Sequence, residues 1–535
     1  MHSAMTYDHV IVGAGSAGCV LADRLSANPA TRVLLLEAGG RDWHPFIHMP
    51  AGIGKLASNP RHNWNYTTEP QANLEGRRLW WPRGKVLGGS SSINAMCYIR
   101  GVRGDYDDWA RRTGDPRWAW DNVLGYFRRS EANARGADAL HGADGPLSVS
   151  DLRHRNPLSQ VFLDAASAAG FPRNPDFNGA AQEGFGFYQV TQRNGARCST
   201  AASFLREARG RPNLTVRTHA TVQQLLFSGA RAIGVDYRHH GRLKRAEAGE
   251  VLLAGGALNS PQLLMLSGIG PADHLREQGI GVRHALAGVG SNLQDHLDIC
   301  SLTHCNEAIT YDKVNDVAVA LEFLFKRSGI GTSNIAECGG FLRSRHAEDE
   351  RCDLQFHFVP AMLDDHGRNK LEGHGYTLHA CMLRPKSRGS LRLKSNDPQQ
   401  PIAIHANYLS DVDGYDLKML VEATRLSHAI FAQAPFDRYR GATIFPDIDI
   451  ADDRAVEAFI RHKAETVYHP VGTCRMGNDD GAVVDSELRV HGITGLRVVD
   501  ASVMPDLPTG NTNAPTIMIA ERASDLILGR NPLQR

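Results

Sequence analysis

Short apolar runs near the start of the chain predict two strands of a parallel sheet with a helix between them. Residues 7–12 (YDHVIV) and 33–36 (VLLL) have the apolar character of strands that are covered on both faces. The segment between them carries a helical packing set, namely Ala17, Val20, Leu21, Ala22 and Leu25. We expect this helix to begin near Ser16 and to stop at Asn28-Pro29, because proline disfavours continuation.

Two later segments repeat the change from strand to loop to helix. Residues 251–254 run into Gly255-Gly256, and residues 496–499 run into Asp500. A helix follows each, the first opening with Ser260-Pro261, since proline suits the first helical turn, and the second covering 514–528. Together with 7–36, these segments predict a Rossmann-like domain assembled from distant parts of the chain.

The pattern changes between about residues 300 and 460. Apolar and polar positions alternate in segments such as 378–383 and 389–393, with proline, asparagine and aspartate at the turns. This pattern predicts a mostly antiparallel second domain. The fold class is therefore α/β (α+β overall): a discontinuous dinucleotide-binding domain over 1–155, 196–299 and 465–535, and a β-sheet substrate-binding domain over 156–195 and 300–464.

The segment 316–326 (DVAVALEFLFK) is strongly apolar and has a helical pattern. We interpret it as a helix packed into the core, with a membrane-facing or lid element as the alternative. No apolar run approaches the ~18 residues that a membrane-spanning helix needs. Peripheral contact with the inner membrane stays an alternative.

Charge and cysteine content exclude several classes of protein. The 535 residues carry 59 basic and 58 acidic side chains, so no electrostatic footprint for nucleic acid is present. Nine scattered cysteines without a Cys-x-x-Cys pair predict reduced thiols, and the first residues lack the pattern of a signal peptide, so we expect a cytoplasmic protein. His44 and His48 are separated by Pro45 and have no carboxylate partner nearby, so we expect no metal site.

A glycine motif follows the first strand. Residues 13–18 (GAGSAG) place Gly13, Gly15 and Gly18 in the Gly-x-Gly-x-x-Gly spacing between strand and helix, where a helix N-terminus attracts a pyrophosphate. Glu37 ends the second strand, at the place where a carboxylate accepts hydrogen bonds from a ribose. The motif predicts dinucleotide binding but does not distinguish nicotinamide from flavin cofactors.

Longer motifs carry a resemblance to a known family. Residues 84–107 (GKVLGGSSSINAMCYIRGVRGDYD) and 256–270 (GALNSPQLLMLSGIG) resemble the two signature segments of the glucose-methanol-choline (GMC) family of FAD oxidoreductases. The resemblance runs from residue 7 to about 528 and includes VYHPVGTCRMG at 467–477 and TGNTNAPTIMIAERASDLI at 509–527. Among relatives the pattern looks most like bacterial choline dehydrogenases and aliphatic-alcohol dehydrogenases.

The resemblance implies a set of FAD-binding residues. It places the small-residue loop containing Gly84, Gly88 and Ser91 beside the flavin ring, with Asn94 near its reactive face. The other expected cofactor contacts are Ser16, Ala38, Val222, Asp500 and Ala501. Some relatives carry at position 93 a histidine that attaches covalently to FAD. Aliphatic carbon cannot form that bond, so Ile93 predicts non-covalent FAD.

The same resemblance assigns the chemistry. Oxidising an alcohol requires hydride transfer to flavin N5 and a base for the hydroxyl proton, and His469 matches the catalytic histidine of the family. Asn513 matches the second active-site position and would donate a hydrogen bond to the developing alkoxide. Glu337 and His357 are candidate substrate contacts, although an ordinary strand histidine would explain His357 equally well.

The sequence therefore predicts an FAD-dependent alcohol dehydrogenase that forms an aldehyde or ketone and passes electrons to a quinone or another carrier. Two alternatives stay open: an alcohol oxidase that uses O2, and an FAD-containing hydroxynitrile lyase. The substrate alcohol is not specified by any motif.

Overall fold

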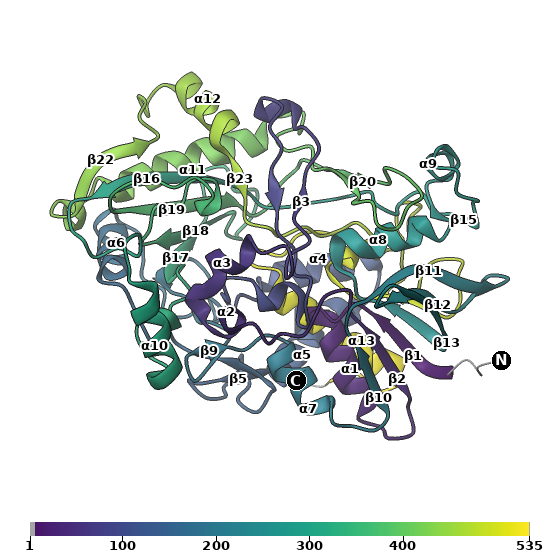
Figure 1. Ribbon diagram of the computed structural model, residues 1–535. Coiled ribbons are helices and arrows are strands. Elements are labelled where there is room, and N and C mark those ends of the chain that lie inside the picture. Colours follow the sequence, from purple (N-terminus) through teal and green to yellow (C-terminus); the bar gives the residue numbers. More distant parts are fainter. Residues whose placement is uncertain (1–5, 534–535) are drawn as a thin grey trace.

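Two seven-stranded sheets organise the computed structural model, which describes residues 6–533. The first sheet has the strand order β10-β2-β1-β13-β12-β11, with β24 beside β13 (Figure 1). Its strands are β1 (Thr6–Val12), β2 (Val33–Leu36), β10 (Leu214–Arg217), β11 (Ala220–Ser228), β12 (Arg231–His239), β13 (Arg242–Leu253) and β24 (Leu496–Val498). They come from the beginning, middle and end of the chain, so the sheet is discontinuous in sequence.

The parallel part of this sheet creates the edge at which the site lies. β1 pairs in parallel with β2 and with the last half of β13, which also pairs in parallel with β24. The helix α1 (Ser16–Ser26) connects β1 to β2 as the sequence predicts. Because parallel strands end at the same edge, the residues after β1, β13 and β24 meet there, namely Gly13, Ala254 and Asp500.

One helix start differs from the sequence prediction. The helix α8 is Gly256–Leu266, so it begins four residues before Ser260, and Pro261 lies inside it. Proline cannot donate to the carbonyl four residues earlier, and the Thr473 hydroxyl donates to that Ala257 oxygen instead, at 2.6 Å. The helix α13 (Asn513–Ile527) agrees closely with its prediction.

The second sheet is antiparallel, with the strand order β22-β16-β19-β18-β17-β7 and β23 beside β16. Its strands are β7 (Gly184–Phe187), β16 (Leu297–Cys305), β17 (Cys338–Leu342), β18 (Leu354–Val359), β19 (Gly375–Met382), β22 (Arg440–Phe445) and β23 (Glu465–Thr466). The helices α6 (Pro157–Ala168) and α11 (Tyr415–Phe431) pack on it through aromatic rings, including Phe162 stacked on Phe358 at 4.7 Å. Because β16 begins before residue 300 and β23 follows 464, this sheet crosses the boundaries that we predict for the second domain.

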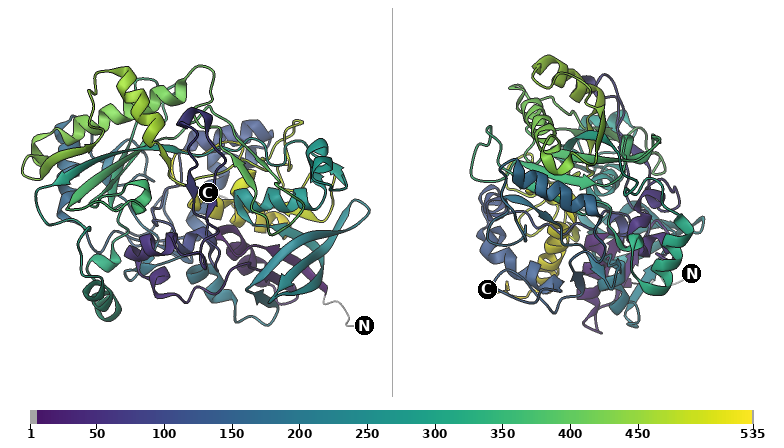
Figure 2. Two further views of the ribbon diagram at one scale, coloured as in Figure 1. Left: turned by 45° about the horizontal axis from the view of Figure 1, so that its top comes forward. Right: turned by 90° about the vertical axis from the view of Figure 1, so that its left-hand side faces the viewer.

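The helix α10 (Asp316–Lys326) forms as predicted, but the prediction that it packs into the core is wrong. Phe323 is its only buried residue, whereas Val317, Leu321, Leu324 and Phe325 are 49–78% exposed. Figure 2 shows α10 projecting from the body of the molecule. Apolar periodicity establishes that a helix has an apolar face, but it does not say what covers that face.

All nine cysteines are free and buried. Among residues 6–533, no helix combines the length and apolar character needed to cross a bilayer. The first five residues, on which the prediction about a leader depends, lie outside the described part of the chain.

Candidate active site

A cavity of about 510 Å³ extends from the glycine motif to the second sheet. We call the part around Gly13, Gly15 and Glu37 the glycine end, and the part around His357, His379 and His469 the histidine end. Most predicted site residues line it: Gly13, Gly15, Ser16, Glu37, Ala38, Gly84, Asn94, Val222, His357, His469, Asp500, Ala501 and Asn513. Gly18, Gly88, Ser91 and Glu337 do not line it.

The glycine end is shaped by close backbone contacts. A Cβ atom at Gly13 would lie 2.5 Å from the Ala254 oxygen, and one at Gly18 would lie 1.8 Å from the Gly13 oxygen. Gly18 therefore packs helix against strand behind the cavity. The Glu37 carboxylate accepts hydrogen bonds from the Ala14 and Gly39 backbone amides, at 2.9 and 2.8 Å, and burial raises its pKa to about 7.

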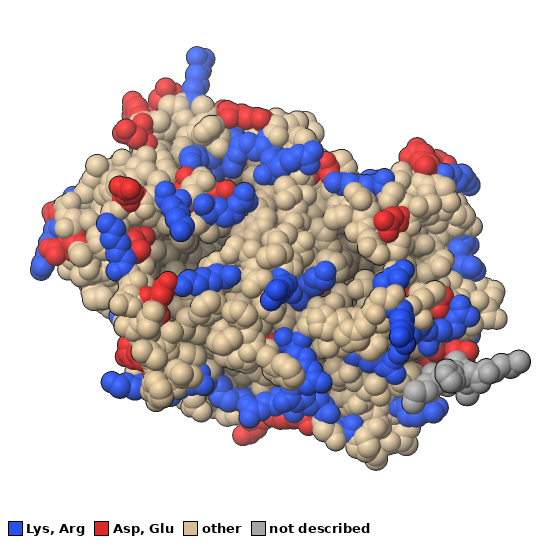
Figure 3. All heavy atoms as spheres, viewed as in Figure 1, with Lys and Arg blue, Asp and Glu red and all other residues tan. Residues whose placement is uncertain are grey.

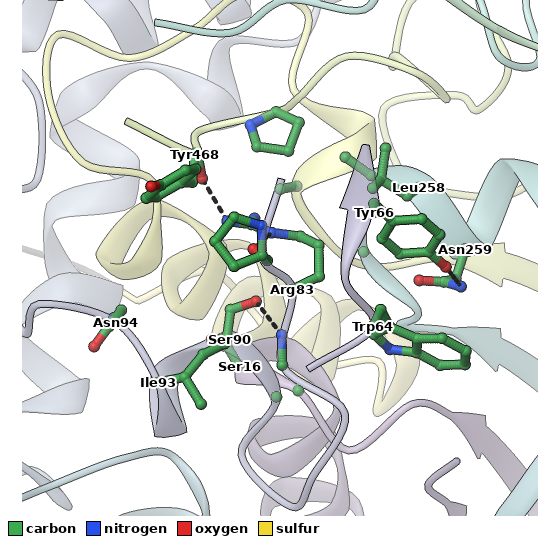
Figure 4. Close-up of a pocket in the computed structure, with 18 of the residues that line it drawn as sticks. Ser16, Trp64, Tyr66, Arg83, Ser90, Ile93, Asn94, Leu258, Asn259 and Tyr468 are labelled. Carbon is green, nitrogen blue, oxygen red and sulfur yellow. Dashed lines mark hydrogen bonds between the residues drawn. The ribbon is translucent and has the colours of Figure 1, made fainter. Parts of the chain in front are cut away.

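The loop after Gly84 forms one wall of the cavity. Ser90, Ile93 and Asn94 face the cavity, on the opposite side from Tyr66, Leu258 and Asn259 (Figure 4). Ser91 is turned away instead, and its hydroxyl donates to the Gly88 oxygen at 2.6 Å. The predicted contacts Gly88 and Ser91 thus support the loop from behind.

A buried arginine that sequence reasoning missed holds this loop in place. Arg197 donates to the Ser91 and Asn94 carbonyls at 3.2 and 2.6 Å, and also to the Asn94 side chain at 2.9 Å. Burial lowers the pKa of Arg197 to about 9. Because the loop is anchored at both carbonyls, the orientation of Asn94 toward the cavity is fixed.

Asp500 joins the ends of β24 and β13. Its carboxylate accepts hydrogen bonds from the Gly256 amide at 2.8 Å, the Ser260 hydroxyl at 2.6 Å and the Ser502 amide at 2.8 Å. The Gly256 amide is the first of α8, where a negative charge is favourable, and Ser260 lies one turn further along the same helix. Asp500 therefore fixes the start of α8 at the cavity wall.

His469 lies at the histidine end and has a defined tautomer. His296 Nε2 lies 3.0 Å from the Leu383 carbonyl, which can only accept, so this nitrogen carries the proton. His296 Nδ1 then has a lone pair, which accepts from His469 Nδ1 at 3.0 Å. His469 Nε2 is consequently unprotonated, and it accepts from the Asn511 amide at 3.1 Å.

Burial keeps both imidazoles neutral. It lowers the pKa of His469 well below its ordinary value, with a further contribution from His296, and it lowers the pKa of His296 to about 3. Asp295 holds the backbone of this segment by accepting from the His469 amide at 2.7 Å, and burial raises its pKa to about 6. A neutral imidazole with a lone pair toward the cavity can act as a base.

The asparagine beside His469 is Asn511, whereas the sequence prediction selected Asn513. The Asn513 side-chain oxygen accepts instead from the Ser16 hydroxyl at 2.7 Å, so this residue contacts the glycine end. Asn513 is the first residue of α13, and two positions along the chain separate it from Asn511. In TGNTNAPT both asparagines have suitable side chains, and only the path of the chain before α13 distinguishes them.

A second missed residue connects Asn511 to the antiparallel sheet. Gln355 of β18 donates to the Asn511 oxygen at 3.1 Å and lies 3.2 Å from His357 Nε2. Burial lowers the pKa of His357 to about 4, so this ring is neutral as well. The amide of Asn511 is therefore oriented by Gln355 so that its nitrogen faces His469 Nε2.

Glu337 does not contact the cavity. It is fully buried, and one carboxylate oxygen accepts from the Asn156 amide and the Ser159 hydroxyl, both at 2.7 Å. The other oxygen accepts from Ser333 at 2.6 Å and from Tyr311. With all these donors in place, Glu337 ties together the segments behind the cavity wall, and its neighbour Ala336 lines the cavity instead.

A histidine–aspartate pair borders the histidine end. His379 lines the cavity, and its Nδ1 lies 2.6 Å from the buried Asp298 carboxylate. Burial alone would lower the pKa of His379, but the Asp298 carboxylate raises this pKa above its ordinary value. The ligand atoms of Asp298, Cys300 and His379 lie within 4.8 Å of one another, as do those of Asp365, His366 and Glu465, so the absence of a metal stays a prediction.

Comparison with known proteins identifies the family. The model of the GMC oxidoreductase N-terminal region matches residues 7–298, and that of the C-terminal region matches residues 385–520. The chain belongs to the GMC oxidoreductase family.

Similar GMC oxidoreductases cover the whole length of the chain. An "Alcohol dehydrogenase [acceptor]" of Pseudomonas putida is 50% identical, with 98% of this chain and 96% of that protein covered. An "Oxygen-dependent choline dehydrogenase" of Paraburkholderia phytofirmans is 46% identical, with 100% and 96% covered. The crystal structure of pyridoxine 4-oxidase from Mesorbium loti has a TM-score of 0.90 at 32% identity, with 98% and 100% covered. The predicted fold class is confirmed.

The cavity fits the FAD on which GMC oxidoreductases depend. Its glycine end leaves no room for a Cβ atom and opens at the N-terminus of α1, which suits a pyrophosphate. Gly89 approaches Gly15 so closely that a Cβ would lie 2.6 Å from the Gly15 Cα atom, so the two loops form one continuous wall. An extended dinucleotide can follow this wall from Glu37 toward His469.

Proposed function

We propose that this protein is an FAD-dependent alcohol dehydrogenase in which His469 is the catalytic base. It oxidises a neutral alcohol to an aldehyde or ketone and passes the electrons to a quinone or another carrier. The observation that supports this role most strongly is the hydrogen-bond chain from Leu383 through His296 to His469, which leaves the lone pair of Nε2 toward the cavity. The named activities of the relatives agree with this reaction class.

FAD, when bound, supplies the two-electron acceptor for the hydride that leaves the alcohol carbon. The substrate hydroxyl takes the place at which Asn511 now donates to His469 Nε2, and His469 accepts the hydroxyl proton there. The Asn511 amide remains a donor, and it stabilises the negative charge that develops on the substrate oxygen. His296 accepts from Nδ1 throughout and keeps the imidazole in the reactive tautomer.

The charge of the histidine end favours a neutral substrate. Glu37 and Asp500 are the only carboxylates among the described residues that line the cavity, and both belong to the cofactor-binding part. Glu337, which could have paired with a quaternary ammonium, is enclosed by its own donors. With no carboxylate at the histidine end to pair with a quaternary ammonium, we expect choline to be a weaker substrate than an uncharged alcohol of the same shape.

Ile93 supports non-covalent FAD. Its side chain lines the cavity and belongs to an apolar cluster with Ile47, Leu56 and Val86, which offers no nucleophile. The flavin of the purified protein is therefore expected in the supernatant after acid precipitation. Flavin that stays with the precipitated protein would contradict this assignment. The nine free thiols agree with a reducing compartment, and we place the protein in the cytoplasm.

The decisive experiment is anaerobic reduction of the bound flavin, followed by absorbance. Choline is compared with 3,3-dimethylbutan-1-ol, in which an uncharged carbon replaces the ammonium nitrogen. We expect the neutral alcohol to reduce the flavin with a kcat/KM at least about tenfold higher, and His469→Ala to retain FAD while losing this reaction. Preference for choline would refute the argument from charge, and an active His469→Ala would refute the assignment of the base.

Admission of oxygen after reduction tests the acceptor. Slow recovery of the oxidised spectrum is expected of a dehydrogenase, and rapid recovery would identify an oxidase instead. If no alcohol reduces a flavin that dithionite reduces normally, cyanohydrin cleavage becomes the reaction to test.

A further inference from the structure

The exposed apolar face of α10 has no partner within the chain. Val317, Leu321, Leu324 and Phe325 are 68%, 49%, 61% and 78% exposed. At about 100° per residue, these four positions occupy a single face of the helix, roughly 150° from the buried Phe323. The face therefore points away from the body of the protein, as the projecting helix in Figure 1 also indicates.

The helix is held firmly although this face is bare. Asn315 accepts from the Val317 and Ala318 amides, both at 3.1 Å, and caps its N-terminus. Lys55 of the neighbouring helix α3 (Ile53–Ala57) forms an ion pair with Asp316 at 2.5 Å. A capped helix that is fixed at its end presents its apolar residues in one orientation. A frayed segment would not hold them in one orientation.

The charges around α10 are arranged for an anionic surface. Its two acidic residues are engaged, Asp316 with Lys55 and Glu322 with the Ser328 hydroxyl at 3.1 Å, and neither lies on the apolar face. Besides the paired Lys55, exposed basic residues stand at both ends of the helix: Lys313 near its start, and Lys326, Arg327 and Arg153 near its end. In Figure 3 the surface over α10, at the lower left, is mostly uncharged, with both basic and acidic residues beside it.

We propose that α10 docks this protein on an anionic lipid bilayer, lying in the interface with Val317, Leu321, Leu324 and Phe325 inserted among the acyl chains. An apolar face flanked by basic residues is the pattern of interfacial helices, in which apolar burial and attraction to anionic headgroups both contribute. A protein partner or a second copy of the chain would have no comparable need for basic residues at both ends of a charge-free face.

The position of α10 suggests why docking would help the enzyme, and only this part of the inference rests on the proposed function. Ile53, Gly54 and Ala57 of α3 line the cavity, and Gly54 is exposed, so the cavity reaches the surface beside the Lys55–Asp316 pair. A docked α10 brings that opening next to the bilayer. Apolar alcohols and lipid-dissolved electron carriers can then reach the cavity from the membrane.

The test is co-sedimentation of the FAD-loaded protein with vesicles. We compare vesicles of phosphatidylcholine alone with vesicles that also contain phosphatidylglycerol, at low and high KCl. The wild-type protein is expected to bind the anionic vesicles, and to bind them less at high salt because screening weakens the basic contribution. Leu324→Glu and Phe325→Glu are each expected to lower the partition coefficient by about tenfold or more, since an inserted side chain becomes charged.

Leu243→Glu is the matched control. Leu243 is 63% exposed, close to the value for Leu324, and it lies among basic residues at the distant end of β13. This variant should bind vesicles like the wild type. Equal loss in Leu243→Glu and Leu324→Glu, or no vesicle binding at all, would overturn the proposal.

A second outcome would also overturn it. If the wild type forms a dimer that Phe325→Glu dissociates, while vesicle binding is absent, a second copy covers the apolar face. Flavin reduction by alcohol is measured in the same samples without vesicles. Because the substituted residues are distant from His469, this rate should be the same in the variants as in the wild type. A wild-type protein whose flavin is not reduced by alcohol would count against the proposed function rather than against docking.

Discussion

Substitution of His296 tests the tautomer on which the base depends. In His296→Leu the His469 Nδ1 proton loses its acceptor at 3.0 Å, and the Leu383 carbonyl loses its donor. A buried group left without a partner costs about 1–3 kcal/mol, which corresponds to about 5- to 150-fold in rate if the cost is borne by the reactive tautomer. Protonation at Nε2 instead would remove the lone pair that accepts the substrate proton.

His296→Asn is the conservative partner of that variant. The amide oxygen of asparagine lies close to the position of His296 Nδ1, so His469 keeps an acceptor. We therefore expect His296→Asn to recover most of the rate that His296→Leu loses. A residue that served only to fill space would show the opposite order, because leucine fills this buried site without an unpaired amide.

The assay is rapid-mixing anaerobic reduction of the flavin by an alcohol, measured from pH 5 to pH 9, with FAD content determined for each variant. Since burial lowers the pKa of His469 well below its ordinary value, the wild-type rate should stay level through pH 6.5 and fall only at distinctly lower pH. The His296→Leu rate should be lower across the whole range. A His296→Leu protein that keeps its FAD and reduces it at the wild-type rate would show that another group sets the tautomer.

Three further predictions concern the site and its stability. Asn511→Ala should slow flavin reduction about 10- to 100-fold with FAD retained, whereas Asn513→Ala, which leaves the Ser16 hydroxyl without its acceptor, should chiefly weaken FAD retention, measured by gel filtration. Gly89→Ala should abolish FAD binding because its Cβ would lie 2.6 Å from Gly15, while Gly54→Ala, whose Cβ meets nothing within 4 Å, should bind FAD normally in the same titration. His296 should make stability more sensitive to acid, because its folded-state pKa is about 3 and its unfolded form takes up a proton below pH 6.5. Glu37 and Asp295, whose pKa values are raised, act in the opposite direction in both proteins, so the wild type is compared with His296→Asn: by denaturant unfolding the wild type should lose about 2 kcal/mol more than the variant between pH 8 and pH 5.

The parts of the fold that the sequence predicts are those specified by local pattern. β1, α1 and β2 were predictable because a glycine turn, a helical period and Pro29 act over a few residues. The start of α8 was not, since a proline is usual in a first turn, and only the distant hydroxyl of Thr473 makes Pro261 acceptable within the helix. The exposure of α10 was not predictable for a similar reason. Hydrophobic periodicity shows that a helix has an apolar face, but it does not show what packs against that face.

The residues of the candidate site also fall into two groups, those that a local motif specifies and those that reach the site from distant parts of the chain. Residues fixed by backbone geometry, such as Gly13 and Gly15, follow from spacing, and His469 follows from its motif. The partners of His469 do not, because His296 and Asn511 reach it from positions 173 and 42 residues away in the chain. The prediction that Glu337 contacts the substrate had the same weakness. A carboxylate in a cavity-lining segment can point inward or outward, and two of the four donors that hold Glu337 outside the cavity, Asn156 and Ser159, are 181 and 178 residues away in the chain.

The two asparagines of TGNTNAPT contact opposite ends of the cavity, although only one residue separates them in the chain. Asn511 contacts His469, the proposed base, and Asn513, two residues later, contacts Ser16 beside the glycine turn. The short segment between them therefore connects the first turn of α13, which packs against α1, to the histidine end of the cavity. We therefore propose that the two asparagines have different tasks within one motif: Asn511 orients the proton acceptor, and Asn513, which also lines the cavity, supports the glycine end.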